Sequence, residues 1–401
     1  MIIEILLRRW LSTNNVVLCV DIGTTSLKAA LVTAEGGVVS FCSVQFEEPH
    51  DRFVACSWYD AFLRAVGELF CNLRGSQTTA RVCGISISGN GPTVVTDCGL
   101  TFRWNEDTSG VASEIPNCAK TSLFIPKILS VRKQFPEVWK KTKKLFSGPE
   151  FFIHILTGQA VTILPEARFA PAYWSDEVCK ACGIKTSLLP PFAGTGAKCG
   201  FVCDDVMAQL RGLCEPLYGD LSSLVFADKI PVLAGGPDFV VALIGTGTLR
   251  TGRLCDRCGS SEGLNFCTDR PVSGDGLRTL PSVISDLWNV SYLIPNSGEL
   301  SESARLDAVE RGVKTLKAAA ASAGIAFPSE MAVTGGQTND ELLLKEKAQR
   351  LGMTILRPSD NHFVHSELLG DACAGWFGLG VYDSLQTAAE KIVRLSAYEN
   401  L

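Results

Sequence analysis

The sequence has no basic tract. Its 37 lysines and arginines are outnumbered by 42 aspartates and glutamates, which gives a formal net charge of -5 at pH 7. A polyanion needs a concentrated positive surface, so nucleic acids and anionic membranes are poor candidate partners. The sequence also has no apolar run that could cross a bilayer. The stretch from Phe239 to Ile244 is far shorter than the roughly 20 residues that a spanning helix needs.

The first ten residues do not have the order of a secretory signal. They are partly apolar, but Arg8 and Arg9 follow the apolar residues, whereas a signal peptide places its basic residues first. We therefore expect residues 1–15 to be an N-terminal extension or to reflect an ambiguous start site. The sequence has no internal repeat and no low-complexity segment, which leaves a diverged structural duplication open.

Cysteine, by contrast, is abundant, with 16 in the chain. A chain of 401 residues, of which 46% are hydrophobic, has enough apolar material for a core and needs no disulfide staples. The spacings Cys179-x-x-Cys182 and Cys199-x-x-x-Cys203 approach those of zinc ligands, so a zinc site is the alternative. We expect no bound zinc, mostly free thiols and a reducing, cytoplasmic location.

A polar turn lies between the first two predicted strands, residues 16–20 and 27–33. It reads Asp21-Ile-Gly-Thr-Thr-Ser26. Gly23 lets a phosphate approach the backbone, the turn amides can form an anion nest, and further donors come from the hydroxyls of Thr24, Thr25 and Ser26. Asp21 would repel a bare phosphate, so its natural partner is a phosphate-bound Mg²⁺. An ordinary hairpin turn is the alternative interpretation.

Three further loops place glycines at strand ends. Ala234-Gly-Gly-Pro-Asp238 puts a carboxylate at the start of a predicted helix, where aspartate is also a good cap. Cys258-Gly-Ser-Ser-Glu262 is a second hydroxyl turn, and Thr334-Gly-Gly-Gln337 joins a strand to a helix where a flat ligand could approach the backbone. Each loop alone is also explained by ordinary turn chemistry.

Strands alternate with helices on both sides of Arg250. This pattern predicts two α/β domains with a cleft between them. We expect residues 16–250 to form the first domain and residues 251–401 the second.

The order of these motifs resembles the FGGY carbohydrate kinases of the actin-like ATPase superfamily. The resemblance runs from about Val16 to the C-terminus and is strongest to the family's xylulose kinase-like members. Gly84-Ile-Ser-Ile-Ser-Gly89 resembles the strand before the sugar loop, with Asn90 where the family usually has Gln, and Leu156-Thr-Gly158 resembles the end of its helical segment. The resemblance implies two actin-like (ribonuclease H-like) α/β domains flanking a cleft.

The resemblance also implies roles, with ATP and Mg²⁺ as cofactors. The first phosphate loop would comprise Asp21, Gly23, Thr24, Thr25 and Ser26, and the second Gly259, Ser260 and Ser261. The adenosine pocket would be bounded by Gly335, Gly336 and Gln337. Asp238 would be the catalytic base, Asp21 and Asp238 would lie nearest Mg²⁺, and the sugar would lie near Asn90, Trp104 and Asp238.

Two departures from the family pattern shape the functional hypotheses. Trp104 is not followed by the family's Asp-x-Arg, and the segment between Trp288 and Ala304 is short and lacks a Gly-Glu-Arg-x-Pro run, so we expect an abbreviated second domain. The leading hypothesis is an ATP-dependent kinase of a ketopentose such as xylulose or a related polyol-like sugar, with a homodimer left open. The alternatives are a catalytically weak or inactive relative that acts as a sensor or partner subunit and, third, an assembling actin-like ATPase.

Overall fold

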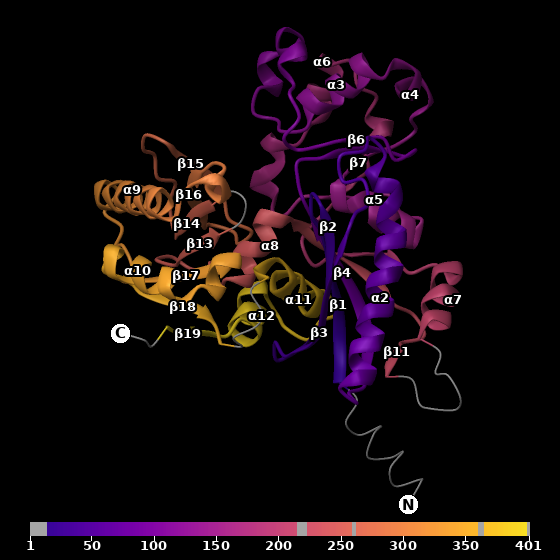
Figure 1. Cartoon of the computed structure of the whole chain (residues 1–401). Coiled ribbons are helices and arrows are strands. Elements are labelled where there is room, and N and C mark those ends of the chain that lie inside the picture. The colour runs from indigo at the N-terminus through magenta and orange to yellow at the C-terminus, as the bar shows by residue number, and fades with distance from the viewer. Residues whose placement is uncertain (1–13, 215–222, 259–261, 360–364, 399–401) are drawn as a thin grey trace, which may run out of the picture. The chain divides into compact units, whose positions relative to one another are not determined.

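The computed structural model describes residues 14–214, 223–258, 262–359 and 365–398 (Figure 1). The chain divides into two compact units. The first contains the chain up to Asp238 together with Ala374–Val381, and the second contains Phe239–Cys373 and Tyr382–Leu401. Residues 1–13 of the predicted extension lie outside the described residues, and Asn14 already belongs to the first strand.

The first unit is built on a seven-stranded sheet in the order β10-β12-β4-β1-β2-β3, with β11 also paired to β4. β1 (Asn14–Ile22), β4 (Ala80–Gly89) and β12 (Pro231–Pro237) are parallel neighbours, whereas β2 (Ser26–Thr33) and β3 (Val38–Gln45) continue from β1 as antiparallel hairpins. Residues 16–22 of β1 are all buried, as expected for a central strand covered on both faces. The remaining strands are β10 (Lys198–Phe201) and β11 (Leu224–Phe226).

Helices cover this sheet because they carry apolar residues at helical spacing. α2 (Trp58–Gly75) buries Phe62, Val66 and Leu69 against β2 and β3. α5 (Gly148–Thr157) packs on β4 and β12, and α7 (Asp204–Leu213) packs against α2. α5 ends at Gly158, which adopts a left-handed φ of 69° that favours glycine.

The rest of the first unit consists of short elements. The segment 164–191 contains the helix α6 (Asp176–Ala181), which begins where the Ser175 hydroxyl accepts a hydrogen bond from the Val178 amide. Two small sheets and further helices complete the unit: β5 (Val94–Thr96), β6 (Thr101–Phe102), β7 (Leu145–Ser147), β8 (Thr162–Ile163), β9 (Phe192–Ala193), α3 (Ile125–Gln134), α4 (Pro136–Lys141), η1 (Val54–Ser57), η2 (Ser109–Glu114), η3 (Asn117–Ala119), η4 (Ala167–Ala172) and η5 (Thr186–Leu188).

The second unit has its own seven-stranded sheet, in the order β15-β16-β14-β13-β17-β18-β19. The chain builds it from the strands β13 (Leu254–Cys258), β14 (Glu262–Thr268), β15 (Leu277–Pro281), β16 (Trp288–Ile294), β17 (Glu330–Gly335), β18 (Thr354–Pro358) and β19 (Leu395–Ala397). Its helices are α8 (Asp238–Gly245), α9 (Glu302–Ser322), α10 (Glu341–Leu351), α11 (Ser366–Gly378) and α12 (Leu385–Ile392), with the short turns η7 (Ser297–Glu299) and η8 (Gly336–Asn339). The first residue of α8 and the end of α11, from Ala374, belong to the first unit. The prediction of two α/β domains is confirmed.

The division between the units falls at Asp238, earlier in the chain than the boundary predicted at residues 250 and 251. The reason lies in the packing of α8 on α11. A Cβ atom on Gly245 would lie 1.8 Å from the Ser366 carbonyl oxygen, and one on Gly370 would lie 1.8 Å from that of Val241. Since both glycines allow the two backbones to touch, residues 239–245 belong with the second unit.

None of the helices in the described ranges is long and apolar enough to cross a membrane.

Candidate functional site

Three parallel strands of the first unit end at the same level of the sheet. Ile22 of β1 pairs with Gly89 of β4, and Gly89 in turn pairs with Pro237 of β12. The next residues along the chain are therefore neighbours beyond the carboxyl ends of these strands, which is where open α/β sheets usually bind ligands. We call these residues, Gly23, Thr24, Asn90 and Asp238, the polar edge, and include Trp104, which follows β6 and contacts Thr24 through its side chain.

The hydroxyl turn at the end of β1 is compact. The Gly23 amide donates to the Ser26 carbonyl oxygen at 2.9 Å. A Cβ atom on residue 23 would lie only 3.0 Å from that same oxygen, so a larger residue would require the turn to shift slightly. Thr25 is exposed, Thr24 is half-buried and Ser26 is buried.

The Thr24 hydroxyl joins the predicted phosphate loop to two of the predicted sugar-binding residues. Its Oγ1 accepts a hydrogen bond from Asn90 Nδ2 at 3.3 Å and another from Trp104 Nε1 at 3.3 Å. Both the backbone and the side chain of Asn90 are held. Its backbone N–H donates to the Ile22 carbonyl oxygen at 2.9 Å, and its side-chain Oδ1 accepts from the Thr93 hydroxyl at 3.0 Å. The Trp104 side chain is 45% exposed and leaves an aromatic surface open to a ligand.

Asp21, the predicted Mg²⁺ ligand, is buried near the end of β1. Its Oδ2 lies 3.3 Å from Nζ of Lys28, its pairing partner on β2. Carboxylate and hydroxyl oxygens are hard donors, so these residues fit Mg²⁺ chemically. β4 lies between β1 and β12, which separates the backbones of Asp21 and Asp238 by about 10 Å, so one ion could not easily be held by both carboxylates without water or phosphate oxygens.

Asp238 is half-buried and is the first residue of α8. β12 runs directly into this helix, and Gly236 accommodates the change of direction with a φ of 150°, which side chains rarely tolerate. An ionised carboxylate at a helix N-terminus is stabilised by the helix dipole. The local geometry therefore suits both an ionised base and a helix cap.

In the second unit, the predicted adenosine residues follow β17. Gly335 has a φ of 95°, and a Cβ there would lie 2.2 Å from the Cys258 carbonyl oxygen, so only glycine fits beside β13. A Cβ on Gly336 would meet nothing within 4 Å, which leaves its backbone approachable. The Gln337 side chain instead enters a buried group of polar residues. Gly259, Ser260 and Ser261, the predicted second phosphate loop, lie outside the described residues.

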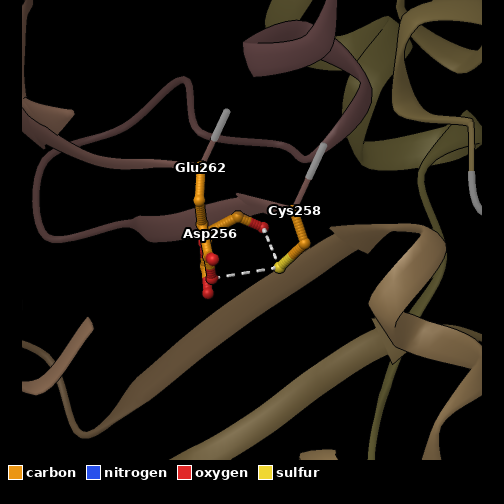
Figure 2. A group of neighbouring side chains, drawn as sticks. All are labelled: Asp256, Cys258 and Glu262. Atoms are coloured by element: carbon orange, nitrogen blue, oxygen red, sulfur yellow. Dashed lines mark hydrogen bonds between the residues drawn. The ribbon is translucent and has the colours of Figure 1, made fainter. Parts of the chain in front are cut away.

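That buried group, which we call the lysine cluster, comprises Asp256, Cys258, Glu262, Gln337 and Lys347. The Lys347 ammonium donates to Asp256 Oδ2 at 2.6 Å, to Glu262 Oε1 at 3.0 Å and to Gln337 Oε1 at 3.1 Å. Figure 2 shows Asp256, Cys258 and Glu262 side by side, with the Cys258 thiol donating a hydrogen bond to a carboxylate oxygen of Glu262. Sequence reasoning missed Asp256, Glu262 and Lys347. The available signal was one acidic residue in each of two short strands that are mostly apolar.

The charges in the lysine cluster perturb one another strongly. Burial raises the pKa of Asp256 to about 7, and the neighbouring Glu262 adds to this effect although Lys347 opposes it. Burial alone would raise the pKa of Glu262 too, but Lys347 and the hydrogen bonds around it lower the pKa below its ordinary value. Burial alone would lower the pKa of Lys347, but the two carboxyl groups outweigh it and raise the pKa. Lys347 is therefore a permanent internal cation.

The sixteen cysteines are all free thiols. Among the described residues, the group of three or more potential metal ligands that the fold brings together is Asp256, Cys258 and Glu262. The pairs Cys179–Cys182 and Cys199–Cys203, weighed above as zinc ligands, do not assemble into such a group within that part of the chain.

A separate cavity of about 490 Å³ lies in the second unit beside α12. It contains none of the predicted site residues. Its charged lining is balanced between two arginines and two glutamates, Arg250, Arg253, Glu330 and Glu390, so it favours no particular ligand charge.

Comparison with protein-family models gives no match. Among curated proteins, the chain is similar to the xylulose kinase of Lactococcus lactis, with 24% identity over 263 residues that cover 58% of this chain and 49% of that protein. It is also similar to the xylulose kinase of Bacillus subtilis, with 24% identity over 61% of this chain and 52% of that protein. The chain thus spans about half the length of the curated relatives it matches.

Solved structures share the fold over nearly the whole chain. A Plasmodium falciparum glycerol kinase with ADP matches with a TM-score of 0.74 and 15% identity over 96% of this chain and 94% of the other. A xylulose kinase from Brucella ovis matches with a TM-score of 0.72 and 15% identity over 93% and 92%. The chain is thus similar in sequence to xylulose kinases over about half of their length, and it shares the fold of solved carbohydrate kinases over nearly its whole length.

Proposed function

We propose that this protein is an ATP-dependent sugar kinase whose substrate is a ketopentose such as xylulose or a related polyol-like sugar. The observation that carries the proposal is the polar edge, where a hydroxyl turn, Asn90 and a carboxylate follow three adjacent strands and the Trp104 side chain contacts the turn. The substrate class rests on the similarity to proteins named xylulose kinase. The nucleotide is supported by the shared fold with a glycerol kinase described with ADP.

The roles of the residues follow from their chemistry. Asn90 and Trp104 would orient the sugar, with its ring against the exposed indole. Asp238 would accept the proton of the attacking hydroxyl while that oxygen approaches the γ-phosphate. The amides and hydroxyls of the Gly23–Ser26 turn would bind phosphate oxygens, and Asp21 would hold Mg²⁺, which supplies charge neutralisation on the phosphates. Phosphoryl transfer needs little more from the protein than this positioning.

The second candidate function is a catalytically weak relative that binds nucleotide or sugar as a sensor or partner subunit. One observation favours it. The residues after Trp104 form a closed turn, in which Glu106 accepts a hydrogen bond from the Arg103 amide at 2.8 Å and pairs with Arg52. Glu106 is therefore already engaged and not directed at a sugar.

The test is Asp238→Asn in an assay of ADP release against a panel of sugars. Asparagine caps a helix about as well as aspartate but cannot act as a base. If Asp238 is the base, turnover falls on the order of 10²-fold or more while stability and ligand affinity are kept. Asp204→Asn is the matched control, because Asp204 is also the first residue of a helix but is exposed in α7.

Two outcomes would count against the proposal. Unchanged turnover in Asp238→Asn would make Asp238 a helix cap and move the base elsewhere. A wild-type protein that binds ATP but phosphorylates no sugar on the panel would favour the sensor function.

A further inference from the structure

The lysine cluster encloses an ammonium group where a metal ion could lie. The ligand atoms of Asp256, Cys258 and Glu262 all lie within 4.8 Å of one another, a spacing that suits metal ligation (Figure 2). Lys347 Nζ lies among them, at 2.6 Å and 3.0 Å from the two carboxylates and 3.5 Å from the Cys258 sulfur. The chain thus fills its own cation site with a side chain.

The burial of this ammonium is complete. The side chains of Lys347, Asp256 and Glu262 all have 0% exposure. A buried charge is tolerated only when its partners satisfy it fully, and here Gln337 provides a further acceptor at 3.1 Å. An arrangement with this many fixed bonds defines the positions of the backbone segments that contribute to it.

Those segments are the two that flank the predicted nucleotide motifs of the second unit. Cys258 and Glu262 are register partners at the facing ends of β13 and β14, on either side of residues 259–261. Gln337 follows directly after Gly335 and Gly336, and its Nε2 donates to Glu262 Oε2 at 3.2 Å. Lys347 lies on α10 and contacts both segments, through Glu262 and Gln337.

We propose that Lys347 is a positioning residue for nucleotide binding, because it fixes the ends of the β13–β14 hairpin against the Gly335–Gln337 turn. The nucleotide part of this inference rests on the proposed kinase function. The residue touches no substrate; it acts through Glu262, Cys258 and Gln337. Nucleotide affinity then depends on Lys347, whereas sugar affinity, which arises at the polar edge of the first unit, does not.

The experiment uses the full chain with Lys347→Met, which keeps much of the side-chain volume and removes the charge. Calorimetry gives the dissociation constants of Mg-ATP and of the sugar. Hydrogen exchange, measured without any nucleotide, follows the amides of Cys258, Glu262 and Gln337. Lys314→Met is the matched control, because Lys314 is an exposed lysine on α9 whose ammonium pairs with Glu310 within the same helix.

We expect the Mg-ATP dissociation constant of Lys347→Met to rise about tenfold or more, as is typical when a supporting residue behind a binding group is lost. The sugar dissociation constant should stay within about twofold. Exchange at the three amides should accelerate about tenfold or more relative to the control. If Lys347→Met does not fold, the double variant Glu262→Gln/Lys347→Met replaces it, since it leaves one buried carboxyl that can be neutral.

Several results would overturn the inference. Unchanged Mg-ATP affinity in a folded variant would remove Lys347 from nucleotide binding. Equal weakening of ATP and sugar would indicate general misfolding and no specific role. A wild-type protein without nucleotide binding would overturn the kinase proposal and the nucleotide role together, while the exchange rates would still show whether Lys347 holds the two segments in place.

Discussion

The polar edge of the first unit and the lysine cluster of the second differ in how they satisfy their polar groups. At the polar edge, Thr24 accepts two hydrogen bonds of 3.3 Å from side chains that are partly open to solvent. In the lysine cluster, the bonds from the ammonium to its oxygen acceptors measure 2.6 to 3.1 Å, and the charged side chains are fully buried. Long, replaceable bonds suit a surface that exchanges them for a ligand. Short, enclosed bonds suit a fixed scaffold.

The largest effect on stability should come from removing the cation of the lysine cluster. Lys347→Met leaves two buried carboxyl groups without their cation, so we expect the free energy of unfolding to fall by about 3–5 kcal/mol. Urea unfolding of the variant against wild type measures the loss. The exposed pair in Lys314→Met should contribute no more than about 0.5 kcal/mol. If Lys347→Met lost as little stability as Lys314→Met, the lysine cluster would not be a fixed scaffold.

A smaller effect should come from a buried acid that has no such cation. Glu150 of α5 is buried in the first unit, where its Oε1 accepts a hydrogen bond from the Ile163 amide at 2.7 Å. Burial raises its pKa from 4.5 to about 7. The folded state therefore holds a proton that the unfolded state has released, so stability falls as pH rises from about 4.5 to 7 and is level above that range.

Glu150→Gln keeps the acceptor for Ile163 and removes the titration. We expect the difference in unfolding free energy between wild type and Glu150→Gln to change on the order of 3 kcal/mol between pH 4.5 and pH 8, at about 1.4 kcal/mol per unit of pKa shift. The comparison with wild type cancels the contributions of other titrating groups, including Asp256. A difference that does not vary with pH would show that Glu150 is ionised in the folded protein.

The smallest effect on stability should come from the polar edge. Trp104→Phe keeps an exposed aromatic ring and removes the donor to Thr24, so the free energy of unfolding should change by no more than about 0.5 kcal/mol. The KM for the sugar should rise about fivefold, because the ring that would contact the sugar loses the hydrogen bond to Thr24 that positions it. Steady-state kinetics measures the change in KM, and urea unfolding measures the change in stability. A large loss of stability with a normal KM would show that Trp104 supports the fold and not the sugar site.

The two regions were also unequally predictable. The Asp21–Ser26 turn and the Asn90 loop are contiguous motifs at strand ends, and the resemblance to the kinase family predicted that they belong to one site. The lysine cluster depends on a contact between residues 91 positions apart, and a lysine on a charged helix such as α10 ordinarily faces water. Asp256 and Glu262 indicated only that some partner was needed. A buried charge in a strand requires a partner, and only the fold shows which residue it is.

The boundary between the units illustrates the same limit. The alternation of strands and helices predicted a boundary at Arg250, but α8 joins the second unit through Gly245 and Gly370, which allow backbone contact with α11. Single glycines in a sequence do not indicate which other helix they will meet.

The enclosure of Lys347 also makes it a chemical probe. Reagents that modify amines need an accessible, unprotonated nitrogen, and Lys347 offers neither while the second unit is intact, because it is fully buried and its pKa is raised. The Lys314 side chain, 73% exposed, should react readily in the same sample. Modification of Lys347 in native buffer therefore requires a transient opening of the second unit. When the unit closes faster than the reagent reacts, the rate of Lys347 modification reports the free energy of that opening.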